Sequence, residues 1–173
     1  MGGSPTLSSL FAQRVVIGVG DMAVSSSPNV TLSTYALGSC VGAIIYDPVT
    51  FAGGMIHIML PNSKLSPEKA ALKPYIFADT GMKAFFDALK GIGVDKFRAR
   101  IAIAGGASVL EQKDIFKIGE NNAIAIKGIL SKEHLPIFYE ELGGLNNRTL
   151  HLVLSTGELE IKQPTTTKKI LLK

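Results

Sequence analysis

The sequence predicts an α+β fold, a layered sandwich of mixed and antiparallel sheets with helices on its outer faces. Hydrophobic residues make up 46% of the chain and charged residues 18%, which is the balance of a protein with a packed core. Strand-like runs follow one another through short turns, while only two long segments have helical spacing. Consecutive hairpins with few helices favour this layout over a doubly wound parallel sheet.

Short apolar runs, rich in β-branched residues and bounded by turn residues, predict the strands. Asp47-Pro48-Val49-Thr50 places Asp first and Pro second, as type I turns prefer, so it is expected to close a hairpin. Thr156-Gly157 predicts another tight hairpin. The expected strands are 14–19, 30–37, 41–46, 54–60, 97–104, 137–142, 150–155 and 158–162.

Two segments, 77–90 and 120–132, carry apolar residues at helical spacing. Gly91 is the expected stop of the first. The polar, proline-broken stretch 62–74 is expected to be a loop with one helical turn after Pro67.

The chain of 173 residues has room for one domain, which we expect over residues 14–162. Residues 1–13 are rich in Ser, Gly and Thr, and residues 163–173 are Thr-rich and then basic. Both ends are therefore predicted to be flexible tails.

Composition excludes several classes of protein. No apolar run reaches the roughly 18–20 residues of a membrane span, so no membrane insertion is expected. A single cysteine excludes an internal disulfide and a multi-cysteine metal site, which favours a cytoplasmic protein. Nucleophilic chemistry at a lone thiol would require neither a metal nor a cofactor. The net charge of +4 comes without tryptophan and with 7% aromatics, so nucleic acid is not an expected partner. An acidic protein surface fits this charge equally well.

Cys40 is the candidate nucleophile, because it is the only thiol and follows Leu37-Gly38-Ser39 at the break between two strand-like runs. Glycine allows a sharp turn there and a close approach of backbone to a ligand. A thiol attacks only as thiolate and needs a base beside it. The backbone amides of Gly38, Ser39 and Cys40 could form an oxyanion hole that binds the substrate.

His57 is the candidate base. If the hairpin turn is centred on Pro48 and Val49, Cys40 lies directly opposite His57, and opposed residues share one face of a sheet. A slip of one residue would separate the two. Thr34, on the preceding strand-like run, offers a hydroxyl that can accept the other imidazole N–H and so orient the ring.

Each candidate also has a purely structural interpretation. Cys40 could fill a core position, His57 could be a satisfied core histidine, and threonine is common in strands. His134 and His151 are expected on the surface or in a sheet, and the stretch 105–108 lacks the full phosphate-loop pattern, so a structural turn is favoured. Asp79 and Thr80 are expected to cap a helix.

Several motifs together resemble the bacterial chemoreceptor glutamine deamidase family CheD. The most specific is the combination of a Gly-Ser-Cys segment with a His-x-Met-Leu-Pro segment at this spacing. The resemblance covers roughly residues 14–162. It is carried by residues 35–42, 46–48, 53–61, 78–80, 104–108, 118–122, 143–144 and Arg148.

The resemblance implies that Cys40, His57 and Thr34 are the catalytic residues, in a sandwich similar to a bacterial toxin domain that deamidates glutamines. It implies a protein-glutamine glutaminase acting on cytoplasmic helices of chemoreceptors, with a CheC-type chemotaxis phosphatase as a further partner. Two alternatives stay open: a protein that mainly binds and regulates that phosphatase, and a cysteine hydrolase of another amide.

Overall fold

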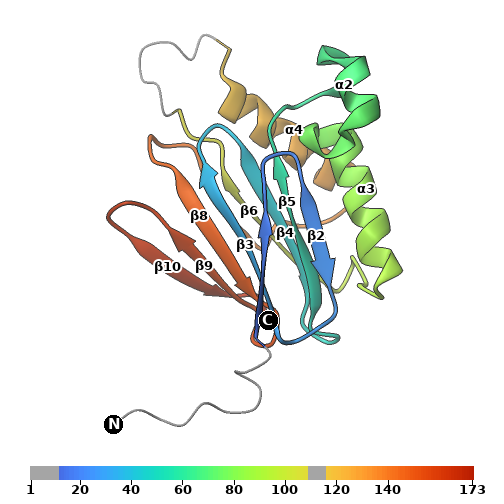
Figure 1. Cartoon of the computed structure of the whole chain (residues 1–173), viewed down its shortest axis with the longest axis vertical. Helices are drawn as coiled ribbons and strands as arrows, with labels where there is room; N and C mark the ends of the chain where they lie inside the picture. Colours follow the sequence, from blue (N-terminus) through green and yellow to red (C-terminus); the bar gives the residue numbers. More distant parts are fainter. Residues whose placement is uncertain (1–11, 109–115) are drawn as a thin grey trace.

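Two five-stranded sheets pack face to face in the computed structural model, which describes residues 12–108 and 116–173 (Figure 1). Each sheet contains one parallel pair, and its other pairs are antiparallel. The predicted α+β layout is thus confirmed. The open sheet has the order β1 (Gln13–Ile17), β3 (Val30–Leu37), β8 (Arg148–Val153), β9 (Glu158–Lys162), β10 (Thr167–Leu171). The helix-backed sheet has the order β2 (Met22–Ser25), β5 (Ala52–Ile58), β4 (Val41–Asp47), β6 (Arg100–Gly105), β7 (Tyr139–Leu142).

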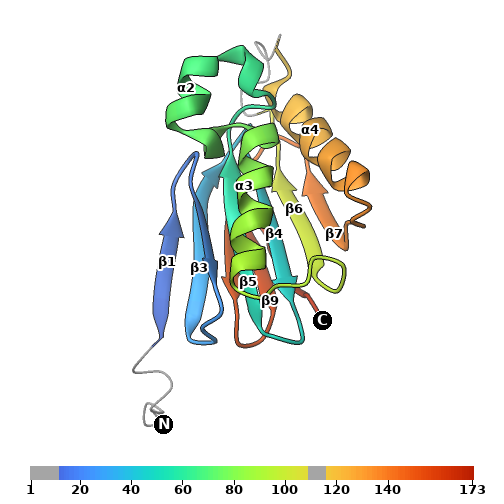
Figure 2. The same ribbon diagram turned by 90° about the vertical axis from the view of Figure 1, so that its right-hand side faces the viewer.

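The long helices α3 (Ala78–Gly91) and α4 (Ile118–Lys132) both cover the outer face of the helix-backed sheet (Figure 2). Helices were expected on the outer faces of both sheets. Within the described residues the open sheet has none on its outer face, so the layers are helix, sheet, sheet. The expected loop 62–74 holds more structure than predicted. Its short helices are η1 (Ser63–Leu65) and α2 (Pro67–Leu72), with η2 (Pro74–Ile76) leading into α3.

The central strands β4 and β5 are buried on both faces, which explains their continuous apolar sequence. Ala43 and Ile45 face the helices, whereas Ile44 and Tyr46 face the open sheet. The space between the sheets is filled by a second apolar cluster that includes Leu150. We call this cluster the inter-sheet core, and polar side chains in it are shielded from water.

A β-bulge interrupts β3 close to its end. Thr34 pairs with Leu150 and Leu37 with Arg148, so β3 contains one residue more than β8 over this stretch. Ala36 takes up the extra residue in a left-handed conformation, with φ of 56°. Because side chains alternate along a strand, the extra residue lets both Thr34 and Leu37 point into the inter-sheet core.

Two strands were not predicted from the sequence, β2 and β10. The prediction of a flexible tail over 163–173 is wrong where β10 lies. This strand pairs antiparallel with β9 and is followed by Leu172, which is fully buried. The Nζ of Lys169 forms an ion pair with a carboxylate oxygen of Glu158 in β9 at 3.0 Å, a contact that the basic sequence alone does not reveal. Of the expected N-terminal tail, residues 1–11 lie outside the described residues, and Gln13 already belongs to β1.

Candidate active site between the sheets

His57 and Thr34 meet across the gap between the two sheets. His57 is fully buried in β5, and its Nδ1 lies 2.8 Å from the hydroxyl oxygen of Thr34 in β3. Thr34 is also fully buried. The pairing proposed from the sequence is therefore present as a hydrogen bond between two strands of different sheets.

The proton positions of this pair follow from a third group. The Thr34 hydroxyl donates its single proton to the backbone carbonyl of Ile17 in β1, at 2.7 Å. It can then only accept from His57, so the imidazole carries its proton on Nδ1. The other nitrogen, Nε2, is left with a free lone pair. Nε2 is buried and has no hydrogen-bond partner among the described residues. The carbonyl of Ile17 carries no signal in the sequence, and only the structure identifies its role.

Cys40 lies in the bend that carries the chain from β3 into β4. Its side chain is partly buried against the inter-sheet core. The predicted register is wrong by two residues, because Gly42 and not Cys40 pairs with His57. The turn is two residues longer on its second side than assumed, since Asp47 pairs with Ala52 and not with Thr50. A shift of two keeps both side chains on one face, so Cys40 stays diagonal to His57.

The bend around Cys40 is held by backbone bonds from the turn after β6. The amide of Ala107 donates to the Gly38 carbonyl, and that of Gly106 donates to the Cys40 carbonyl, both at 2.8 Å. Gly105, with φ of 120°, passes so close that a Cβ there would overlap the Cys40 carbonyl oxygen. The glycine stretch thus has a structural role, because it supports the bend that carries Cys40.

The donors of the bend differ from the prediction in one respect. The Gly38 amide is already bonded to the Ala36 carbonyl at 2.9 Å. The Ser39 amide has no acceptor within the described part of the chain. The Cys40 amide likewise has no backbone acceptor there, and it lowers the pKa of its own thiol. The two amides available to an incoming ligand are therefore those of Ser39 and Cys40.

Burial favours the neutral forms of His57 and Cys40. It lowers the pKa of His57 to about 4. It raises the pKa of the Cys40 thiol, an effect that the Cys40 backbone amide partly offsets. At neutral pH the site therefore holds a thiol beside an uncharged imidazole rather than a thiolate–imidazolium pair.

The remaining candidates lie elsewhere. His151, in β8, is 2.7 Å from the hydroxyl of Ser33 on the opposite face of β3, and His134 is exposed. Asp79 does not cap its own helix: its carboxylate accepts the amide and hydroxyl protons of Ser63, with the hydroxyl at 2.6 Å.

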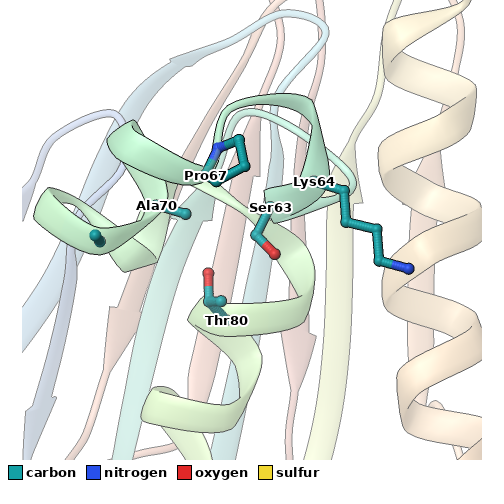
Figure 3. A pocket seen from close by; sticks show the side chains of 6 residues that line it. Ser63, Lys64, Pro67, Ala70 and Thr80 are labelled. Carbon is teal, nitrogen blue, oxygen red and sulfur yellow. The ribbon is translucent and has the colours of Figure 1, made fainter.

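A hollow of about 380 Å³ lies beside that contact, between η1, α2 and the start of α3. Ser63 and Thr80 face it, whereas Lys64 extends toward α4 (Figure 3). The Thr80 hydroxyl already donates to the Pro74 carbonyl at 2.6 Å. None of the three predicted catalytic side chains lines this hollow.

Two further properties concern ligands and membranes. Among residues 12–108 and 116–173, no group of three or more His, Cys, Asp or Glu side chains is placed to hold a metal ion. No helix in the same part of the chain is both long and apolar enough to cross a membrane.

The sequence matches a known family and several relatives. The CheD chemotactic sensory transduction family matches residues 59–163. A probable chemoreceptor glutamine deamidase CheD of Solibacter usitatus is 39% identical over 151 residues, or 87% of this chain and 89% of its own. The protein of that name from Desulforamulus reducens is 40% identical over 152 residues, covering 86% of this chain and 90% of its own. That from Pyrococcus horikoshii is 36% identical over 160 residues, covering 91% and 97%.

The family match begins two residues after His57, but the pairwise matches are longer. An alignment that spans 87% of this chain necessarily includes Thr34, Cys40 and His57. Among solved structures, the hypothetical protein YfiH of Bacillus licheniformis is similar over 70% of this chain and 49% of its own, with 13% identity and a TM-score of 0.44.

Proposed function

The chain belongs to the CheD family, as its motifs predicted, and we propose that it hydrolyses the side-chain amide of glutamine residues in chemoreceptors. Cys40 is the nucleophile, His57 the general base and Thr34 the residue that orients His57. The relatives carry the name of probable chemoreceptor glutamine deamidase, which supports this substrate class.

One observation carries the proposal. The Thr34 hydroxyl has given its proton to Ile17, so it accepts from Nδ1 of His57 and leaves a buried lone pair on Nε2. A histidine with a purely structural role in the core would have hydrogen-bond partners for both ring nitrogens. The side chain diagonal to it is Cys40, the only cysteine of the chain.

In the first half of the reaction, Nε2 of His57 takes the proton from the Cys40 thiol as the sulfur attacks the carboxamide carbon of glutamine. The carbonyl oxygen becomes an oxyanion, bound by the amides of Ser39 and Cys40. His57 then passes its proton to the amide nitrogen. The C–N bond breaks, ammonia leaves, and a thioester with Cys40 remains.

In the second half, His57 takes a proton from water as the water oxygen attacks the thioester carbon. The C–S bond breaks, and the sulfur regains a proton from His57. The products are glutamate and ammonia, and the enzyme returns to its starting state. The residues present suffice for these steps, and the scheme uses no cofactor.

The neutral resting pair determines when the proton moves. With the pKa of His57 at about 4 and that of Cys40 raised, the proton is transferred during the attack and not before it. A bound oxyanion and the departing amine then stabilise the imidazolium that burial disfavours. A buried imidazole of low basicity also releases its proton readily to the leaving nitrogen.

The proposal is tested with membranes that carry the chemoreceptors of the source organism. After incubation with the protein, mass spectrometry of receptor peptides should show glutamine converted to glutamate at defined positions. The variant Cys40→Ala provides the control. Equal conversion by the two proteins would overturn the assignment of the nucleophile, and no conversion by the wild type would overturn the substrate class.

Two accompanying predictions are part of the proposal. The protein acts at the cytoplasmic side, where receptor helices present their glutamines, and it binds a CheC-type phosphatase. The basic net charge of +4 is compatible with an acidic protein partner. Isothermal titration with a purified CheC-type phosphatase from the same genome tests the second prediction, and absence of heat at micromolar concentrations would contradict it.

A further inference from the structure

Asn122 connects helix α4 to both sides of the site. It is fully buried, and its side-chain amide nitrogen donates to two backbone carbonyls, that of Ser39 at 3.0 Å and that of Met59 at 2.9 Å. Ser39 precedes the candidate nucleophile, and Met59 follows His57 by two residues. One side chain thus ties the bend that carries Cys40 to the end of the strand that carries His57.

The orientation of this amide is fixed by its partners. A flipped side chain would place Oδ1 against the two carbonyl oxygens, and two acceptors cannot bond to each other. In the orientation present, Oδ1 is buried and has no hydrogen-bond partner among the described residues. Leaving a buried acceptor unsatisfied costs free energy. Asn122 therefore keeps its two donated hydrogen bonds even though its Oδ1 stays unsatisfied.

The bond to Ser39 has a consequence for the neighbouring amide. The carbonyl of Ser39 and the N–H of Cys40 belong to the same planar peptide group and point in opposite directions. Holding the carbonyl toward α4 therefore aims the N–H away from the helix. The Cys40 amide also lowers the pKa of the Cys40 thiol, against the larger effect of burial.

Neighbouring peptides are held in the same way. The carbonyls of Gly38 and Cys40 accept from the amides of Ala107 and Gly106, as described above. Three consecutive carbonyls are thus bonded by protein donors. Two of those donors are backbone amides, whereas Asn122 is a side chain, which a substitution can remove.

We propose that Asn122 is a positioning residue for the reaction, which aims the Cys40 amide at the reacting sulfur and at the oxyanion. The inference rests on the proposed function, because it presupposes that Cys40 is the nucleophile. Asn122 does not touch substrate in this scheme. It acts through the Ser39–Cys40 peptide.

The test uses two variants and a matched control. Asn122→Asp keeps the shape and removes both donors, and Asn122→Ala removes the side chain. The control is Asn121→Ala: Asn121 is exposed and donates to the Phe116 carbonyl at 2.9 Å. That change deletes a hydrogen bond from the same helical turn without reaching the bend. Thermal unfolding followed by circular dichroism establishes that each variant is folded.

The decisive measurement is the rate of iodoacetamide alkylation against pH. Because Cys40 is the only cysteine, this rate reports one thiol and needs no substrate. Both Asn122 variants should raise the apparent pKa of the thiol by about half a unit or more, since the Cys40 amide, which favours the thiolate, loses its fixed orientation. They should also lower kcat roughly 10- to 100-fold with KM little changed, as loss of an oxyanion contact does. The Asn121 control should match the wild type in both measurements.

The inference is overturned if folded Asn122→Ala and Asn122→Asp proteins keep the wild-type alkylation profile and kcat. It is equally overturned if Asn121→Ala reproduces their defects, because the effect would then be general loosening of the helix. Failure of the proposed function looks different. In that case Cys40→Ala retains deamidation, whatever the Asn122 variants do.

Discussion

Two adjacent residues of β3 each hold a histidine through a hydroxyl, on opposite faces of the same strand. Ser33 lies 2.7 Å from Nδ1 of His151, and Thr34 lies 2.8 Å from Nδ1 of His57. We call these the outer pair and the inner pair. As isolated hydrogen bonds they are nearly identical.

The surroundings of the two pairs differ. The outer pair lies on the outer face of the open sheet, which no helix of the described residues covers. Its two residues are themselves buried, and His151 packs edge-on against Tyr35 with ring centres 5.6 Å apart. The inner pair is enclosed between the sheets. Only the Thr34 hydroxyl has its proton committed elsewhere, to Ile17, and so only His57 has a defined tautomer and a buried, free Nε2.

The comparison teaches that a hydroxyl–histidine contact is not by itself a catalytic arrangement. What distinguishes the inner pair is the second bond made by the hydroxyl and the thiol diagonal to the ring. The predictions below separate the two pairs experimentally.

Removal of the thiol should give the largest effect. Cys40→Ala is expected to fold normally, because it deletes one partly buried atom, and to lose deamidation by more than about 10⁴-fold. Cys40→Ser should be nearly as inactive, since a hydroxyl stays protonated beside an imidazole of low basicity. Single-turnover deamidation measures both. Substantial activity in Cys40→Ala would contradict the assignment of Cys40 and make the outer pair, which is intact in this variant, the next candidate.

Replacing each histidine in turn tests which ring is the base. His57→Gln should lower the rate about 10²- to 10⁴-fold, the usual contribution of a general base. The rate of His151→Gln should stay within about twofold of the wild-type rate, although His151 makes a similar hydrogen bond to a hydroxyl. The same single-turnover assay applies, and comparable losses in the two variants would contradict the assignment.

The two hydroxyls provide the next comparison. Thr34→Ala should lower the rate roughly 10- to 1,000-fold, or about 1.4–4 kcal/mol of transition-state stabilisation, because an orienting group contributes less than the nucleophile or base. Thr34→Ser, which keeps the hydroxyl, should recover much of this loss. Ser33→Ala should have little effect. If Ser and Ala at position 34 are equally impaired while folded, the hydroxyl is not the orienting group.

The histidine titrations should separate the pairs without any substitution. His57 should stay neutral until the pH approaches its pKa of about 4. The pKa of His151 is also lowered, first by burial and then by Arg14 and Lys162, with Glu160 opposing. We expect His57 to remain neutral to the lower pH of the two. Nuclear magnetic resonance of ¹⁵N-labelled histidine measures this, and it reports the protonated Nδ1 of His57 directly.

The smallest expected effect is on stability. Between pH 6.5 and about 4, His57 binds a proton in the unfolded chain but not in the folded one. The free energy of unfolding therefore falls on acidification through this range, by up to about 3 kcal/mol from this residue. Urea unfolding at pH 7 and pH 4.5 should show a smaller fall for His57→Gln than for the wild type. An unchanged fall would mean that burial does not hold His57 neutral.

Local rules determined much of the architecture from the sequence. Apolar runs and turn residues predicted the hairpin of β4 and β5 and the helices near Ala78–Gly91 and Ile118–Lys132. Alternation placed Cys40 and His57 on one face, and this survived a register error because the shift was of two residues. The motifs around Cys40 and His57 also predicted the family.

Tertiary structure alone decided what lies opposite that face. Which strand of the other sheet meets His57 depends on how the two sheets pack, and neither propensity nor periodicity encodes that contact. The bulge at Ala36 turns Thr34 and Leu37 inward together, and the Ile17 carbonyl fixes the proton of Thr34. β10 likewise depends on a tertiary contact, because it pairs along β9 and is followed by Leu172, which is buried in the inter-sheet core. Such contacts join residues distant in sequence, and their free energy exists only once the sheets have assembled.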